Sequence, residues 1–390
     1  MTFRPGTAAI FRLPLFSICI AFAIVSMAPS DHVMAQQIDV WFGTSTPKNG
    51  LSKGIYHAKF DTDSGKLTKP GLAAEISSPG FLAKHPTLDM LYSVGNVDGK
   101  ASVAAFNVQS TNKSGTLTFV NSAEIGDGGA AHVSVDRSGK FLMTAQYGSG
   151  SAALFELADD GSIAKRLQIE KHQGGSGVVD RRQDKPHAHW TGFSPDNRFA
   201  FVPDLGMDKV VIYSMDADAK KISPHGFGIC PPGGGPRHMK FHPDGDIIYV
   251  LNELALSITA FAYDAKAGTM QPIQTVQTLS DAVKAKETFN SASEIRVHPS
   301  GKFVYSANRG HDSISVFSVD QSSRQLTFVE WEPIRGGWPR NFNLDPTGKW
   351  IIVAGQDSNT ATVFKIDPTT GELTFTRETA MVPSSICVEF

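Results

Sequence analysis

Residues 241–263 read FHPDGDIIYVLNELALSITAFAY, and this segment contains the unit from which the fold is built. A His-Pro-Asp-Gly turn is followed by the apolar run Ile247–Leu251 and then by a second run, Ser257–Tyr263. Proline presets the backbone of a tight turn, and glycine tolerates the left-handed position that follows. Short apolar runs bounded by such turns predict antiparallel β-strands.

The same unit recurs along the chain. Turns of this type start at six positions, 47 to 58 residues apart: His85, Asp136, Ser194, His242, His298 and Asp345. Four short strands per repeat at this period are typical of a propeller blade, whereas a large β-sandwich does not produce the period. We therefore predict an all-β propeller of four-stranded blades.

A seventh blade is split between the two ends of the chain. Val40–Thr44 and Gly54–Phe60 have the pattern of middle strands, with a fourth strand expected near Leu67, but no inner strand precedes them. Ile386–Phe390 can supply the inner strand, which closes the ring and leaves no open sheet edge. The prediction is a seven-bladed β-propeller over residues 38–390, and a six-bladed ring with loose ends is the alternative.

The N-terminus has the features of an export signal. Two arginines, Arg4 and Arg12, precede the apolar run Leu13–Met27, and the small or apolar residues Val33–Ala35 lead to a cleavage site after Ala35. Residues 1–35 are therefore predicted to be a signal peptide of a periplasmic or secreted protein, with no membrane contact after cleavage. The run is shorter than a membrane-spanning helix needs, although an uncleaved anchor is the alternative. The net charge of −2 gives no basic stripe for nucleic acid.

The repeat also predicts where a ligand site can lie. The first strand of a blade lines the central channel and the second returns antiparallel beside it, so the start of the first and the end of the second share one channel mouth. Six residues before the second turn residue of each repeat stand Gly80, Ala131, His189, Arg237, Ser293 and Arg340. Ten residues after it stand Asn96, Tyr147, Leu205, Glu253, Arg309 and Gln356.

The charged and titratable members of these two sets come from neighbouring repeats. They are His189, Arg237, Glu253, Arg309 and Arg340. Arginine offers forked, permanently charged donors to carboxylate or phosphate, and His and Glu can move protons near neutral pH. The pattern predicts a site for a small anionic lactone or carboxylate. A structural ring of ion pairs between blades is the alternative.

Longer motifs surround these positions. They are Pro186–His189, Gly235–His238, Tyr249–Leu254, Ser306–Ile314 and Trp338–Phe342. With these motifs the chain resembles the seven-bladed β-propeller lactonase family, which includes 6-phosphogluconolactonases and carboxymuconate lactonising enzymes. The resemblance extends from about Val40 to Phe390. It implies a catalytic set that falls on His189, Arg237, Glu253 and Arg309. The neighbouring residues His187, Arg340, Asn252 and Asn308 are assigned to substrate binding.

The resemblance implies a lactone hydrolase similar to 6-phosphogluconolactonase, acting on an anionic sugar-type lactone. One arginine would stabilise the carbonyl oxygen and another would hold the substrate anion, while His189 or Glu253 transfers the proton. A lactonising cycloisomerase of the carboxymuconate type is one alternative, and a non-catalytic propeller that binds a ligand or a protein is another. The known reactions are intracellular, whereas this chain carries an export signal, so the substrate itself is left open.

We expect neither a metal nor a cofactor. His187 and His189 form a His-x-His pair, but zinc needs a third ligand, for which His132 is the candidate. Calcium could use the oxygen atoms of Asp204, Asn252 and Asn308, although these side chains are better explained as caps of strand ends.

Two further features have structural interpretations. The polar segment Gly174–Lys185 is expected to be a solvated loop, with a lid over the channel mouth as the alternative. His242 and His298 occupy the turns on the opposite face and are expected to be structural.

Overall fold

The computed structural model describes residues 1–3, 6, 37–111 and 114–390. The predicted signal peptide therefore lies almost wholly outside the described residues, and so does its cleavage site. Within the unit Ala35–Phe390, the described residues form 28 strands and one short helix, α1 (Asp281–Lys284). In the described chain, no helix has the length and hydropathy required to cross a membrane.

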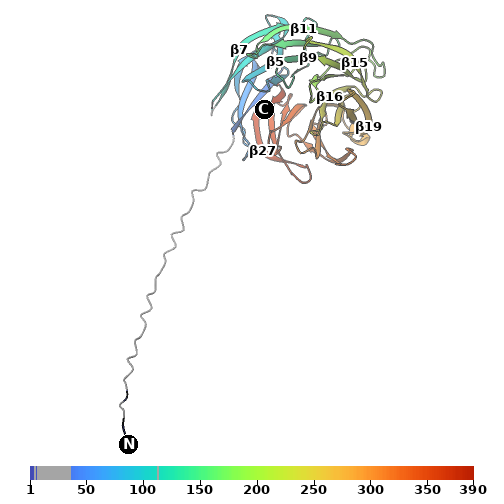
Figure 1. The fold of residues 1–390 in the computed structure, drawn as a ribbon. Helices are drawn as coiled ribbons and strands as arrows, with labels where there is room; N and C mark the ends of the chain where they lie inside the picture. Colours follow the sequence, from blue (N-terminus) through green and yellow to red (C-terminus); the bar gives the residue numbers. More distant parts are fainter. Residues whose placement is uncertain (4–5, 7–36, 112–113) are drawn as a thin grey trace. The chain divides into compact units, whose positions relative to one another are not determined.

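The strands form seven four-stranded antiparallel sheets arranged as a ring, which Figure 1 shows with β16 nearer the centre than β19. We number the sheets as blades 1 to 7. Blade 1 has β4 (Leu82–Lys84), β5 (Met90–Val97), β6 (Lys100–Ser110) and β7 (Gly115–Glu124). Blade 2 has β8 (His132–Val135), β9 (Phe141–Gln146), β10 (Ser151–Leu157) and β11 (Ile163–Lys171). Blade 3 has β12 (Gly192–Phe193), β13 (Phe199–Asp204), β14 (Lys209–Asp216) and β15 (Lys221–Ile229).

The remaining blades follow the same order from the inner to the outer strand. Blade 4 has β16 (Pro236–Phe241), β17 (Ile247–Asn252), β18 (Ser257–Asp264) and β19 (Thr269–Gln277). Blade 5 has β20 (Ser291–Val297), β21 (Phe303–Arg309), β22 (Ser313–Val319) and β23 (Leu326–Pro333). Blade 6 has β24 (Pro339–Leu344), β25 (Trp350–Gly355), β26 (Thr360–Ile366) and β27 (Leu373–Met381). Blade 7 has β28 (Ser385–Glu389), β1 (Gln37–Thr44), β2 (Gly54–Asp61) and β3 (Gly71–Glu75).

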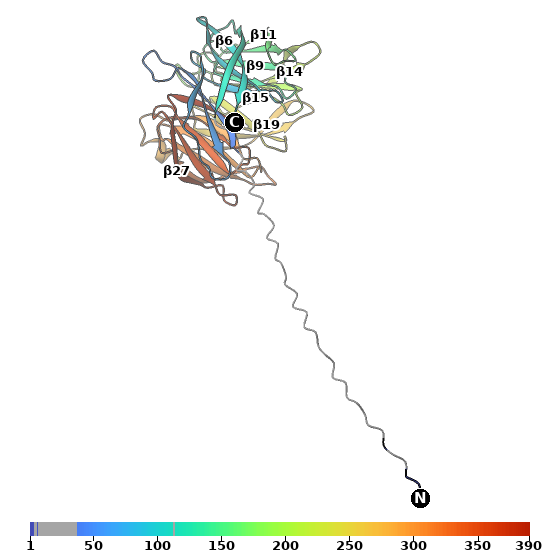
Figure 2. The same ribbon diagram turned by 90° about the vertical axis from the view of Figure 1, so that its left-hand side faces the viewer.

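Blade 7 closes the ring as predicted. Strand β28 pairs antiparallel with β1, with Phe42 opposite Val388, and Figure 2 shows blue N-terminal strands beside red C-terminal ones. The expected position of the fourth strand needs a correction. Leu67 forms only an isolated bridge with Phe60, and the strand itself starts at Gly71.

The core lies between the faces of neighbouring blades. Between blades 3 and 4, for example, Phe201 packs in one buried cluster with Val250 and Phe261. The second strand of a blade is covered on both faces, which explains why Ile247–Leu251 is a continuous apolar run and does not alternate with polar residues.

The repeated turns also connect one blade to the next. The imidazole Nε2 of His242 is hydrogen-bonded to the carbonyl oxygen of Gly301 in the following turn, at 3.1 Å, and His298 makes the same contact with Gly348 at 2.8 Å. Gly301 has a φ of +70°, and a Cβ there would lie 2.3 Å from His242 Nε2. Glycine is therefore required at this turn for both backbone and space. These contacts support the structural interpretation of His242 and His298.

Candidate functional site

Two β-bulges aim arginines into one mouth of the channel. In β16, Pro236 pairs with Asn252 and His238 with Leu251, so Arg237 has no partner in the ladder. The same irregularity in β24 surrounds Arg340, between Pro339 and Asn341. A bulge redirects a side chain that would otherwise follow the alternation of the strand. The repeated bulge thus explains why equivalent positions of blades 4 and 6 both face the mouth.

Glu253 and Arg309 reach the same mouth from the ends of second strands. Glu253 follows β17, and its backbone N–H donates to the carbonyl of Gly235 at 2.7 Å. Arg309 is the last residue of β21 and pairs with Ser291. The structure therefore brings Arg237, Glu253 and Arg309 together, as their equivalent positions in the repeat had predicted.

The carboxylate of Glu253 is the centre of this cluster. Its Oε2 lies 2.9 Å from Arg237 Nε and 3.2 Å from Arg309 Nη2. Its Oε1 accepts a hydrogen bond of 2.7 Å from Arg182 Nη2. Arg237, Arg309 and Glu253 are each at most 6% exposed, so the ion pairs are shielded from solvent.

The charges of the cluster do not balance. Burial alone would raise the pKa of Glu253, but the charges of Arg309 and Arg237 outweigh it and hold the pKa well below its usual range. Burial and the charge of Arg309 lower the pKa of Arg237 to about 9, which leaves it protonated at neutral pH. Four arginines, with Arg340 and Arg182 included, thus surround one carboxylate and give the mouth a surplus of positive charge.

Arg340 differs from the other arginines of the group because it has no polar partner among the described residues. Its guanidinium makes no hydrogen bond or ion pair with any residue that the structure describes, although it lies close enough to Arg309 and Glu253 to feel their charges. Burial and the charge of Arg309 lower its pKa. A half-buried guanidinium in this situation is a ready donor for an anion.

His189 lies in the wall of the mouth, and only 5% of it is exposed. Burial, reinforced by the charge of Arg237, lowers the pKa of His189 well below its usual value, so the imidazole is neutral at neutral pH. Its Nδ1 is buried and has no hydrogen-bond partner among the described residues. Its ring contacts those of Tyr147 and His238, at centroid distances of 5.5 Å and 5.3 Å.

Sequence reasoning did not assign Arg182 to the site. The segment Gly174–Lys185 carries it over the mouth, where Arg182 Nη2 contacts Glu253 and donates to Tyr147 Oη at 3.3 Å. Gln183 anchors the segment by donating to Asp208 Oδ1 at 2.6 Å. Most of the segment is exposed, as expected for a solvated loop, and only Arg182 and Gln183 turn inward, so its action as a lid stays a prediction.

Trp338 was also missed as a part of the site. Its ring lies 5.6 Å from the guanidinium carbon of Arg309 and stacks on Phe289 at a centroid distance of 5.4 Å. Phe289 is 48% exposed, so the pair forms an aromatic rim beside the arginine cluster. The one sequence signal for Trp338 is its position two residues before Arg340.

The other predicted substrate-binding residues lie deeper. His187 stacks on Tyr147 at 4.4 Å, and its Nδ1 is 2.8 Å from the Tyr147 carbonyl oxygen. Asn252 and Asn308 are fully buried, and their amides donate to hydroxyls of their own blades, such as Ser257 Oγ. This geometry favours strand-end caps, and a contact of these two amides with substrate stays a prediction.

The zinc and calcium alternatives gain no support. Among the described residues, the ligand atoms of His132, His187 and His189 do not form a group of metal-binding size. Asp204 accepts hydrogen bonds from the backbone N–H of His187 and is paired through its other oxygen with His172 Nδ1 at 2.6 Å. Its oxygens are therefore already in use.

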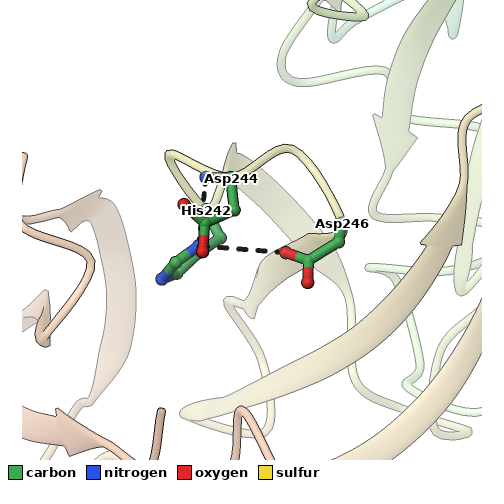
Figure 3. A group of neighbouring side chains, drawn as sticks. All are labelled: His242, Asp244 and Asp246. Atoms are coloured by element: carbon green, nitrogen blue, oxygen red, sulfur yellow. Dashed lines mark hydrogen bonds and ion pairs between the residues drawn. The ribbon is translucent and has the colours of Figure 1, made fainter. Parts of the chain in front are cut away.

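One group in the described chain does have metal-binding spacing, and it lies in a turn on the opposite face. It consists of His242, Asp244 and Asp246 (Figure 3). Arg324 Nη2 contacts both carboxylates, and His242 Nε2 is bonded to Gly301. The exposed carboxylates thus have their cation in Arg324, and we assign no metal to the turn.

Comparisons with known proteins agree with the fold. A family model described as a lactonase, 7-bladed β-propeller, matches residues 39–390. The 6-phosphogluconolactonase of Bacillus subtilis is 38% identical over 352 residues, which cover 90% of this chain and 97% of that protein. The 6-phosphogluconolactonase of Formosa agariphila is 34% identical, with 75% and 82% covered. The structure of the periplasmic gluconolactonase of Pseudomonas aeruginosa has a TM-score of 0.83 and 30% identity, covering 91% of this chain and 99% of that one.

Proposed function

This chain belongs to the seven-bladed β-propeller lactonase family, and on that premise we propose that it hydrolyses an anionic sugar-type lactone at the arginine-lined mouth. The observation that carries the proposal is the arrangement of three arginines around Glu253, with Arg340 and a neutral His189 nearby. The named relatives support hydrolysis over lactonisation, because two of them are 6-phosphogluconolactonases and one is a gluconolactonase.

In this mechanism His189 is the proton-transfer group. Water attacks the lactone carbonyl, His189 accepts the water proton, and the imidazolium returns it to the alkoxide when the ring C–O bond breaks. A hydroxy acid results. Glu253 is a poor candidate for the base because arginines occupy both of its carboxylate oxygens. Its role is to hold Arg237 and Arg309 in place.

The arginines divide between two oxygen groups of the substrate. Arg237 and Arg309, fixed by Glu253, stabilise the negative charge that develops on the carbonyl oxygen. Arg340, which has no hydrogen-bond or ion-pair partner among the described residues, binds the phosphate or carboxylate of the substrate. The Trp338 ring beside Arg309 offers an apolar surface to the sugar ring.

We also propose that the protein is exported, with cleavage after Ala35. The signal features of residues 1–35 and the periplasmic location named for the Pseudomonas aeruginosa neighbour support this proposal. An exported enzyme need not meet a sugar phosphate, so a lactone with a carboxylate, such as an aldarate lactone, is a second substrate class to test. Mass spectrometry of the mature N-terminus checks the cleavage site.

The test is a panel of lactones assayed with the purified mature protein. It contains 6-phosphogluconolactone, glucarolactone, the neutral gluconolactone and a carboxymuconate. We expect hydrolysis of at least one anionic lactone, with a loss of about 10²–10⁴-fold in kcat for His189→Asn and about 10²–10³-fold for Arg309→Ala.

The control is His298→Ala in the turn on the opposite face, which should change stability and not kcat. Turnover of the muconate alone would show a cycloisomerase. No turnover of any compound, together with unchanged stability on loss of Arg309, would favour the binding-module alternative.

A further inference from the structure

A layer of rings closes the channel below the candidate site. Phe81, His132 and His238 contact one another, with centroid distances of 4.4 Å, 5.6 Å and 5.5 Å. His238 is fully buried, and its Nδ1 lies 3.1 Å from Glu294 Oε1. These rings thus lie between the candidate site, where His238 contacts His189, and the other mouth, whose lining includes Phe81 and His132.

A cavity of about 200 Å³ lies at the mouth on the other side of this layer. It is lined by the C-terminal ends of inner strands, which carry Lys84, Lys240, Arg296 and Glu389. Lys240 is three residues after Arg237 on β16, about 10 Å along the strand. The two residues thus point to opposite ends of the channel.

Two of the three cations form no close ion pair among the described residues, although the charge of Glu389 in the same lining acts on Lys240 at longer range. Neither Lys84 Nζ nor Lys240 Nζ makes a hydrogen bond or ion pair with a residue that the structure describes. Lys240 is partly buried, and its ammonium lies 5.1 Å from the centre of the Trp190 ring. An ammonium withdrawn from water without an anion is costly, so the arrangement calls for a negative ligand.

The third cation, Arg296, is fixed in place. Its Nε donates to the Phe342 carbonyl at 3.2 Å, and its Nη2 lies 3.6 Å from Glu294 Oε2. Glu294 is also bonded to His238 and to the side chain of Asn341, so it cannot neutralise the lysines as well. Burial raises the pKa of Glu389, against the opposing charges of Arg296 and Lys84, and this one carboxylate faces three cations in the cavity lining.

We propose that this second cavity binds a small oxyanion, either inorganic phosphate or the carboxylates of a small metabolite. Lys84, Lys240 and Arg296 converge on it from three blades. The cavity volume corresponds to about seven water molecules, which suits a phosphate or a dicarboxylate. The site is independent of the reaction at the catalytic mouth.

The test is the stoichiometry of binding, measured by calorimetry with inorganic phosphate and, separately, with malonate. We expect two sites in the wild-type protein. The variants Lys84→Met and Lys240→Met should each weaken one site at least 10-fold, whereas Arg340→Met should weaken the other. Lys302→Met, at an exposed lysine in the β20–β21 turn on the same face, is the matched control and should bind as wild type does.

The outcomes are distinct. A site lost with Lys84→Met but kept with Arg340→Met supports the second cavity, even if the catalytic mouth binds no phosphate. Binding of both anions that survives Lys84→Met and Lys240→Met overturns the proposal. Lys84 is exposed, so its variant remains informative if Lys240→Met does not fold. Preference for malonate over phosphate would identify a carboxylate metabolite as the ligand.

Discussion

Arg340→Met should separate recognition of the substrate anion from catalysis. The side chain has no hydrogen-bond or ion-pair partner among the described residues, so its loss breaks no such interaction there. It also removes repulsion with Arg309, which is the main charge acting on Arg340. The melting temperature should therefore stay the same or rise slightly.

The kinetic cost follows from the lost contact with the substrate. A hydrogen bond to a charged group contributes about 1.5–3 kcal/mol, which corresponds to about 10- to 150-fold in kcat/KM. We expect this loss with an anionic lactone and less than about 2-fold with its neutral analogue, because the neutral lactone never makes the contact. Arg309→Met should instead impair both substrates by about 10²–10³-fold, since it acts on the carbonyl oxygen that they share.

The assay is a steady-state comparison of 6-phosphogluconolactone with gluconolactone, or of glucarolactone with gluconolactone. Arg377→Met, an exposed arginine on β27 of the same blade, controls for the loss of one positive charge. Equal losses for charged and neutral lactones in Arg340→Met would refute the division of roles between the arginines.

Three more predictions concern Arg182, the buried histidines and the closure of the propeller by β28. Arg182→Met should raise KM for an anionic lactone several-fold and leave kcat within about 3-fold, because Arg237 and Arg309 still hold Glu253; steady-state kinetics in which only kcat falls would contradict this. Burial lowers the pKa of three histidines, which are neutral when folded and protonate in the unfolded chain below about pH 6.5: His132, His189 and His238. As the pH is lowered below 6.5, the free energy of unfolding should therefore decrease, by up to about 4 kcal/mol per pH unit for the three histidines together. Equal urea midpoints at pH 7 and pH 5.5 would argue against this prediction. Deletion of residues 384–390 should cost at least about 5 kcal/mol, since it removes the inner strand with buried Cys387 and Val388, and an unchanged thermal melt would disprove the role of closure.

The fold could be predicted because its repeated unit is local in sequence. Each turn combines proline and glycine chemistry with apolar runs on both sides, and these signals need no knowledge of distant contacts. The split blade was confirmed by the same logic, since Ile386–Phe390 had no other place in a closed ring. The fourth strand of that blade was placed a few residues too early because Leu67 is apolar but follows the turn too closely to form the strand.

The convergence of Arg237, Glu253 and Arg309 was also predictable, because equivalent positions of a repeat occupy equivalent places. Their catalytic roles stay predictions. Arg182 could not be placed in this way, since it lies in a segment outside the repeat whose path depends on tertiary contacts such as that of Gln183 with Asp208. The buried position of Asn252 depends on its hydrogen bond to a hydroxyl of the adjacent strand, and counting positions along the repeat does not reveal such a contact.

The closure of the ring by β28 also determines when folding can finish. β28 starts about 340 residues after β1 ends, so the ribosome makes all six other blades before blade 7 can exist. At about 5–20 residues per second, this takes roughly 17–70 s, during which β1 has no inner partner. Blade 7 is therefore the last blade that can form, and the ring stays open until then.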